Sequence, residues 1–153
     1  MSDPYDLKRF VDAQQNVYAN VVAELKAGSK RSHWMWFVFP QIAGLGFSMM
    51  AQRFAIASRM EAVAYLADPV LGPRLLECTR LVLHTKGKSI HDILGSPDDL
   101  KFRSSMTLFG AVSQEPLFGQ AIAKYYPDGN DQATLDILTR LDLRREAAKR
   151  EPQ

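Results

Sequence analysis

The stretch DLKRFVDAQQNVYANVVAELK, residues 6–26, decides the fold class of this chain. Its apolar side chains recur three or four positions apart, which places them on one face of an amphipathic helix. Gly28 ends the pattern, because glycine commonly follows the last turn of a helix. The apolar positions of this stretch are Leu7, Phe10, Val11, Val17, Val21 and Leu25.

Helix signals continue through the rest of the chain. Ser48 and Ser58 can cap helices with their hydroxyl groups, Pro116 can open one, and the serine-proline pair before Asp98 is a further start signal. No alternating apolar pattern favours more than a very small sheet. We therefore predict an all-α, mainly helical fold of about seven helices around one core. The expected helices cover about residues 6–26, 48–57, 58–68, 73–84, 97–112, 116–126 and 131–141, with a short helical turn at 89–94.

Length and composition indicate one domain. The chain has 153 residues, of which 46% are hydrophobic and 24% charged, values typical of a globular protein that buries a single core. No repeat or linker divides it, so the prediction is a single helical domain over residues 1–153. We expect its core at about residues 5–141 and a fraying polar tail at residues 144–153.

Charge and cysteine content limit the classes of function. Nineteen basic and seventeen acidic residues give a net charge of +2, too small a surplus to indicate nucleic-acid binding without a localised patch. Such a patch would need Lys26, Lys30 and Arg31 to share a face with the basic tail. The lone Cys78 is expected to be a buried thiol. Because neither a signal peptide nor an apolar run of about 20 residues is evident, we expect a cytoplasmic protein with no membrane partner.

The segment SHWMWFVFPQ, residues 32–41, is the best candidate for a site. Its aromatic density and its closing proline favour an extended or turn segment that crosses the core. We expect Trp36 and Gln41 to line a pocket there, although the rings could equally fill a helical core. Gly44, Gly46 and Ser48 follow at the start of a helix, where backbone N–H groups could bind an anion such as phosphate, or could form an ordinary turn.

Two titratable residues are candidate catalytic groups. Glu61, near the aromatic segment, could act as an acid or base or stabilise a positive transition state in glycosidic cleavage. Alternatively, Glu61 completes a capping box with Ser58; Tyr65, one turn further on, suits either role. His33 could donate a hydrogen bond or a proton, or be structural. The other two histidines fit no metal-ligand spacing, so we expect neither a metal nor a cofactor.

A third candidate set is Lys101, Ser104 and Ser105. Residues three and four positions apart are neighbours on a helix, so these groups could together bind a polar ligand. They could equally hydrogen-bond neighbouring loops.

Four motifs give the chain a family resemblance. They are WMWFVFPQIAGLGFS (34–48), EAVAYL (61–66), LGPRL (71–75) and DDLKFRSSMTLF (98–109). Together they resemble the bacterial family called domain of unknown function 1810, over roughly residues 5–141. The resemblance implies a mainly helical single domain and no established reaction.

A second similarity concerns organisation alone. The aromatic segment, the helix bearing Glu61 and Tyr65, the helix bearing Lys101 and the late Asp131 together are similar to the NADAR family of N-glycosidases. The leading hypothesis is therefore a domain that binds, and in one version hydrolyses as an N-glycosidase-like enzyme, a nucleotide-like or phosphorylated metabolite. The alternative is a non-enzymatic protein-interaction module. The oligomeric state is left open.

Overall fold

The computed structural model describes residues 2–150, and in this part of the chain ten helices and no strand are present. The all-α prediction is confirmed, although the helix count is higher than expected. A lone parallel bridge joins Ile42 to Ile56. The helices are α1 (Lys8–Gln15), α2 (Tyr18–Lys26), α3 (Met35–Val38), α4 (Met49–Arg53), α5 (Arg59–Ala67), α6 (Leu71–Leu83), α7 (Ile90–Leu94), α8 (Asp98–Ala111), α9 (Pro116–Tyr125) and α10 (Gln132–Arg150).

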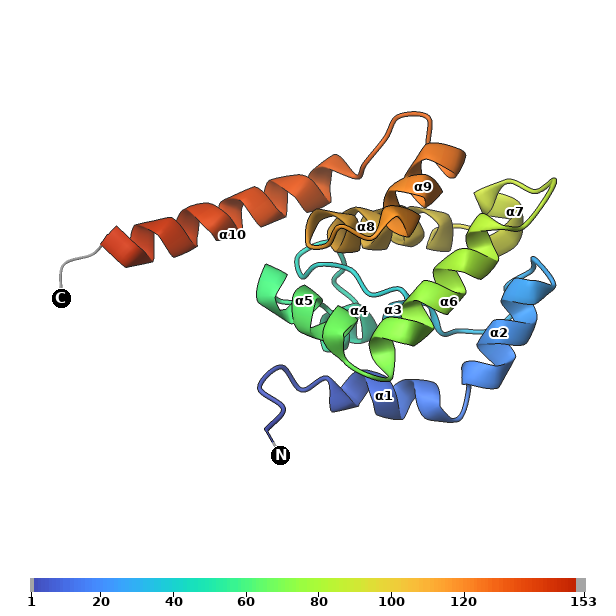
Figure 1. The fold of residues 1–153 in the computed structure, drawn as a ribbon, viewed down its shortest axis with the longest axis horizontal. Helices are drawn as coiled ribbons and strands as arrows, with labels where there is room; N and C mark the ends of the chain where they lie inside the picture. Colours follow the sequence, from blue (N-terminus) through green and yellow to red (C-terminus); the bar gives the residue numbers. More distant parts are fainter. Residues whose placement is uncertain (1, 151–153) are drawn as a thin grey trace.

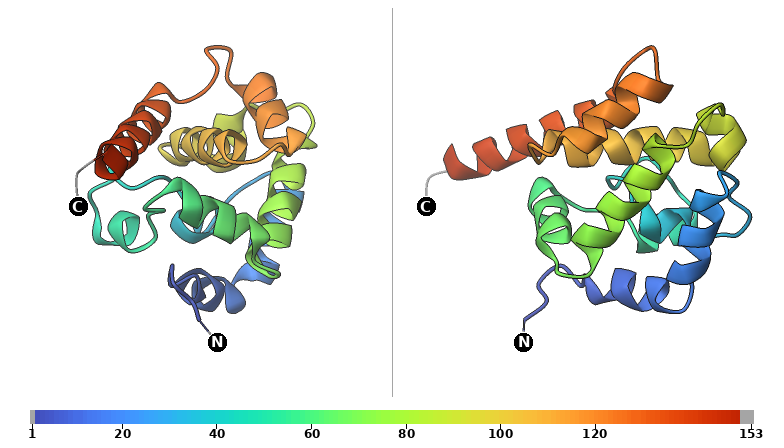
Figure 2. Two further views of the ribbon diagram at one scale, coloured as in Figure 1. Left: turned by 60° about the vertical axis from the view of Figure 1, so that its left-hand side comes forward. Right: turned by 45° about the vertical axis from the view of Figure 1, so that its right-hand side comes forward.

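The helices enclose one apolar core. Helices α8 and α9 form one side of the molecule and α1 and α2 the opposite side, with α3, α5 and α6 between them (Figure 1, Figure 2). A row of aromatic rings crosses the centre: Tyr65 of α5 contacts Phe109 of α8, and Phe109 contacts Phe118 of α9, at centroid distances of 5.3 and 5.9 Å. Aromatic pairs at this spacing add stabilisation beyond their buried area.

The stretch that predicted one long helix forms two helices. Helix α1 ends at Gln15, and α2 begins at Tyr18 in a different direction (Figure 1). The apolar face is buried as predicted, but it is divided between the two helices. The side chain of Gln14, at the end of α1, is also buried and donates a hydrogen bond of 2.7 Å to the carbonyl of Phe37. This polar contact to a distant segment accompanies the change of direction.

Several predicted helix starts are confirmed. Ser48 and Ser58 each cap a helix, accepting a hydrogen bond from the backbone N–H three residues later, and Pro116 occupies the first turn of α9. Helix α4 is shorter than expected, because after Phe54 the chain turns into the bridge at Ile56. These starts depend on local chemistry that the sequence displays directly.

The aromatic segment is helical where an extended path was predicted. Met35–Val38 forms the single turn α3, and Phe39 then leaves the helix before Pro40. Trp34 and Phe39 are almost fully buried, so most of this segment fills the core. Trp36 is the partly exposed ring of the turn and lies between the buried residues Met35 and Phe37.

The end of the chain also differs from expectation. Of the predicted polar tail, residues 144–150 are helical and continue α10, which extends away from the body of the molecule (Figure 1), and residues 151–153 lie outside the described residues. Arg59 of α5 holds the middle of α10 through two hydrogen bonds to Asp142 at 2.9 and 3.0 Å. Beyond Asp142 the helix is exposed. None of the described helices is both long and apolar enough to cross a membrane.

Candidate functional site

Two pockets meet at the exposed face of Trp36. One, of about 370 Å³, lies between the 41–51 segment and α8, and the other, of about 300 Å³, lies between the 30–36 segment and the start of α8. Trp36, Pro97 and Lys101 line both pockets. We call the two pockets together the Trp36 groove. Each has a volume at the lower end of the range for small-molecule sites.

The groove gathers many of the residues predicted from the sequence. Helix α8 supplies the basic side chain of Lys101 and the hydroxyl of Ser104, and the 41–48 segment supplies polar groups and a glycine. His33 lines the second pocket and is exposed. The predicted site residues that line the groove are His33, Trp36, Gln41, Gly46, Ser48, Lys101 and Ser104.

Lys101 is held against the aromatic ring of the groove. Its Nζ lies 4.9 Å from the centroid of the Trp36 ring and 3.6 Å from Asp98 Oδ1. Asp98 also pairs with Lys30, whose Nζ lies 2.8 Å from the other carboxylate oxygen. The ammonium group therefore has a fixed place on the ring face, since cations are attracted to the face of an indole.

Asp131 lines the groove, although the sequence analysis named it as the late aspartate of the NADAR similarity and not as a candidate site residue. Its Oδ2 accepts hydrogen bonds from Ser104 Oγ at 3.0 Å and from the backbone N–H of Thr134 at 3.2 Å. No described residue donates to Oδ1, and Asp131 lines the first pocket. The capping serves α10, while one carboxylate oxygen remains available to a ligand. The sequence predicts Asp131 as the cap of this last helix, and the hydrogen bond from Thr134 confirms it, but no signal in the sequence indicates the pocket.

Glu61, a candidate catalytic residue, does not line the groove that contains Lys101. The residue is 4% exposed. Its Oε2 lies 2.8 Å from Arg9 Nη2, and its Oε1 accepts from the backbone N–H of Ala57 at 3.2 Å. Its own N–H donates to Ser58 Oγ. Both carboxylate oxygens thus stabilise the junction of α1 and α5. In a full capping box the carboxylate of Glu61 would accept from the backbone N–H of Ser58, but here it accepts from that of Ala57.

Tyr65 and Ser105 are core residues and do not line the groove. The Tyr65 ring is fully buried, and its hydroxyl donates to the Phe37 carbonyl and accepts from Gln14. Burial, the main effect, raises the pKa of Tyr65 above its usual value. Ser105 is fully buried, and its hydroxyl has no hydrogen-bond partner among the described residues.

The two glycines of the 44–46 turn have different roles. Gly44 does not line the groove, but its φ of +106° favours glycine. Gly46 lines the groove, and a Cβ there would lie 2.7 Å from the Cβ of Ala51. The Ser48 hydroxyl accepts a hydrogen bond from the backbone N–H of Ala51. That N–H group at the start of α4 therefore already has a partner within the protein.

Glu24 positions the segment that carries His33. One oxygen accepts from the backbone N–H groups of Arg31 and Ser32 and from the Trp34 indole, and the other accepts from the Ser32 hydroxyl. Burial works against ionisation of Glu24, but these hydrogen bonds prevail and lower its pKa to about 2. The ionised carboxylate is therefore part of the structure that supports the groove.

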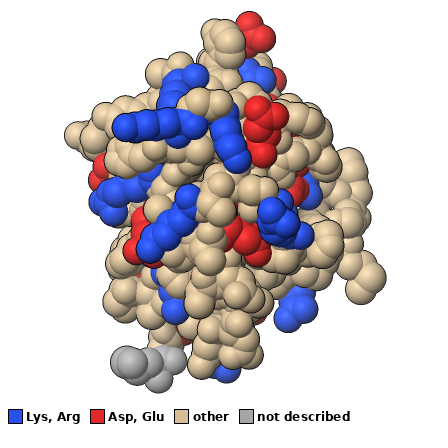
Figure 3. All heavy atoms as spheres, turned by 90° about the vertical axis from the view of Figure 1, so that its right-hand side faces the viewer, with Lys and Arg blue, Asp and Glu red and all other residues tan. Residues whose placement is uncertain are grey.

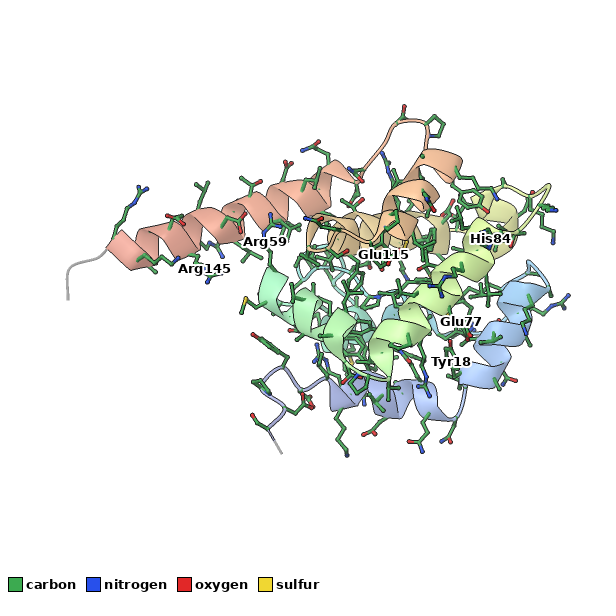
Figure 4. All side chains as sticks on the ribbon, viewed as in Figure 1. Tyr18, Arg59, Glu77, His84, Glu115 and Arg145 are labelled. Carbon is green, nitrogen blue, oxygen red and sulfur yellow. The ribbon has the colours of Figure 1, made fainter. Side chains whose placement is uncertain are left out.

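Two titratable side chains outside the groove, Cys78 and Tyr18, have structural surroundings. Cys78 is buried as expected, and burial, the main effect, raises its pKa to about 12, which opposes formation of a reactive thiolate. Tyr18 of α2 faces Glu77 of α6 and donates to it at 2.6 Å (Figure 4). Among the described residues, no group of three or more metal-ligating side chains comes together.

The chain belongs to the family described as "Protein of unknown function (DUF1810)", whose model matches residues 4–138. This confirms the resemblance seen in the motifs. The chain is also similar to the conserved hypothetical protein Rv1873 from Mycobacterium tuberculosis, known from a crystal structure. The two share 56% identity with a TM-score of 0.88, over 90% of this chain and 99% of the other. Among curated proteins, no match was found.

Proposed function

We propose that the Trp36 groove binds a small, nucleotide-like or otherwise phosphorylated metabolite. The observation that carries the proposal is that a partly exposed indole, an ammonium and a carboxylate line one groove: Trp36, Lys101 and Asp131. A planar ring can stack on an indole, and an anionic group can pair with an ammonium. The amide of Gln41 and the hydroxyl of Ser48 add hydrogen-bonding groups that would orient the ligand.

The charges of the groove favour one orientation of such a ligand. Its phosphate would approach Lys101, whose present partner, Asp98, is 3.6 Å away and can yield to a stronger anion. The phosphate would avoid Asp131, because two negative charges at close range repel. A ring stacked on Trp36 would then lie between the anionic end and the carboxylate.

If the ligand is cleaved, we propose Asp131 in place of Glu61 as the participating carboxylate. Its uncommitted Oδ1 could stabilise positive charge that develops at a glycosidic carbon. His33, in the adjoining pocket, is the candidate proton donor for a leaving group. Binding of the ligand in the groove does not require that it is hydrolysed.

A thermal-shift screen against nucleotides, ADP-ribose derivatives and phosphorylated sugars tests the binding. A ligand at 100 times its dissociation constant stabilises a protein by about 2.7 kcal/mol. We expect a shift with the native chain that Lys101→Ala and Trp36→Ala remove. Lys8→Ala is the charge-matched control, because Lys8 pairs with Asp12 on the exposed face of α1. Absence of a shift with every compound would contradict the proposal.

A second candidate function, a protein-interaction module, is favoured by the apolar residues around the groove. Phe47 is 82% exposed, Met49 89% and Leu100 58%, and Phe47 and Leu100 line the groove. Exposed apolar groups that cluster mark interaction sites. Replacing Met49, which does not line the groove, by serine separates the two functions: a metabolite would retain its thermal shift, whereas a protein partner would lose affinity.

A further inference from the structure

A second hollow on the molecule is lined by basic side chains. It lies where α2 and α6 both end and where residues 84–88 connect α6 to α7, and its volume is about 420 Å³. Its cationic lining residues are Lys26, Arg80, Lys86 and Lys88, and no carboxylate lines it. We call it the basic pocket. Figure 3 views this end of the molecule and shows several Lys and Arg side chains on it.

Most of these cations have no partner within the described residues. Lys88 donates from Nζ to the Gly28 carbonyl at 3.0 Å. Lys26, Arg80 and Lys86, in contrast, are exposed, and their side chains make neither a hydrogen bond nor an ion pair with any described residue. In the Trp36 groove the situation is different, because Lys30 and Lys101 share the carboxylate of Asp98. A cation without a counter-ion can pair with an incoming anion without first losing a partner.

Helix capping does not account for the basic pocket. The ends of α2 and α6 each carry about half a negative charge. Lys88 already serves the end of α2, and Lys124 serves the end of α6, donating to the carbonyls of Leu83 and Thr85. The three remaining full positive charges therefore exceed what the helix ends require.

The walls of the basic pocket are held together by close packing of Gly28 against the side chain of Thr85. Gly28 adopts a φ of +66°, and a Cβ there would lie 3.1 Å from Thr85 Cγ2. The loop after α2 thus packs directly on the loop after α6, and cations from both helices and from the loop face one concave space. A guanidinium with two ammonium groups is the combination that recognises phosphate oxygens.

We propose that the basic pocket is a binding site for a small anion with several negative charges, of the diphosphate class. The concave shape favours a compact ligand over an extended polymer, because the cations surround a hollow and do not form a stripe. The basic residues of the distal half of α10 do not extend the site, because Arg145 lies at the opposite end of the molecule from His84 of the pocket (Figure 4). This inference is independent of the function proposed for the Trp36 groove.

Calorimetric titration of the full chain with inorganic pyrophosphate at low ionic strength tests the site. We expect pyrophosphate to bind and its affinity to fall as salt is added. Arg80→Ala and Lys26→Ala should each lower the affinity by about tenfold, as the loss of a charged hydrogen bond would. Arg80→Lys should retain part of the affinity. Lys8→Ala removes the same charge elsewhere and should leave binding unchanged.

Amide chemical shifts from two-dimensional NMR place the ligand. Pyrophosphate should move the signals of Gly28, which lines the basic pocket, and of Gly87, which lies between the lining residues Lys86 and Lys88. It should not move the indole signal of Trp36. The proposal is overturned if pyrophosphate does not bind, if Lys8→Ala weakens binding as much as Arg80→Ala, or if the Trp36 signal moves instead. It is also overturned if a single-stranded oligonucleotide binds this face and pyrophosphate does not displace it.

Discussion

Glu61 and Asp131 are both shielded carboxylates near aromatic rings, but they differ in how their oxygens are used. Both oxygens of Glu61 are occupied, by Arg9 and by a backbone N–H, and the side chain is buried. Asp131 accepts all its hydrogen bonds on Oδ2 and faces the Trp36 groove. The comparison teaches that a carboxylate near an aromatic segment is a candidate for chemistry only when its partners leave an oxygen available.

The largest expected effect is on the Glu61 side of the comparison. Arg9→Ala would leave the buried carboxylate unpaired and remove the guanidinium that also donates to the Arg53 and Ala55 carbonyls. Breaking a buried ion pair costs about 3 to 5 kcal/mol, so urea denaturation should show a loss of that size. The double variant Arg9→Leu, Glu61→Leu should recover part of it. A loss below about 1 kcal/mol in Arg9→Ala would contradict a structural role for the pair.

Glu24 adds a third carboxylate to the comparison, with an effect that depends on pH. Its pKa is lowered from 4.5 to about 2 in the folded chain, so its ionised form stabilises the fold above pH 4.5. That contribution is lost as the pH falls from 4.5 through about 2. Thermal unfolding across this range should show a smaller decline in Glu24→Gln than in the native chain. Equal declines would mean that the four hydrogen-bond donors do not stabilise the ionised form of Glu24.

The Asp131 side predicts a separation of stability from binding. Asp131→Ala should destabilise the fold by about 1 kcal/mol through loss of the α10 cap. Asp131→Asn keeps a good capping side chain and should unfold like the native chain, since asparagine is as effective a cap as aspartate. Any hydrolysis of a bound metabolite should nevertheless disappear in Asp131→Asn. Unchanged turnover in that variant would remove Asp131 from the chemistry.

The smallest effect on stability belongs to Lys101. Its ammonium is partly exposed and its partner Asp98 retains Lys30 at 2.8 Å, so Lys101→Ala should change the free energy of unfolding by no more than about 0.5 kcal/mol. The same substitution should abolish the thermal shift given by a phosphorylated ligand. If Lys101→Ala caused a large loss of stability and left ligand binding unchanged, Lys101 would have a structural role like that of Glu61.

Local chemistry explains which parts of the fold could be predicted. The caps at Ser48 and Ser58 and the proline at the start of α9 act within one turn, so a single segment of sequence contains all the information. The division between α1 and α2 was missed because the interruption of the apolar spacing between Val11 and Val17 was taken to lie within one helix. The helical end of α10 was missed because its polarity suggested a tail, although Ala147 and Ala148 favour helix.

Local sequence also explains which residues of the candidate site could be predicted. Lys101 and Ser104 were predicted to act together because they lie one turn apart on a helix, and they do line one pocket. Glu61 and Tyr65 were misplaced because their partners, Arg9 and Gln14, lie about fifty positions earlier in the chain. Only the tertiary structure brings those pairs together, and the partner decides whether a polar side chain is structural.

The distal part of α10, residues 143–150, is an exposed helical rod. The family match ends at residue 138, yet the helix continues to Arg150, and residues 143–150 alone rise about 12 Å at 1.5 Å per residue. Every side chain on this part of the rod is exposed. Brief digestion with trypsin should therefore shorten the molecule in discrete steps and leave the core intact, giving a more compact particle for crystallisation. The basic residues at which it would cut are Arg144, Arg145, Lys149 and Arg150.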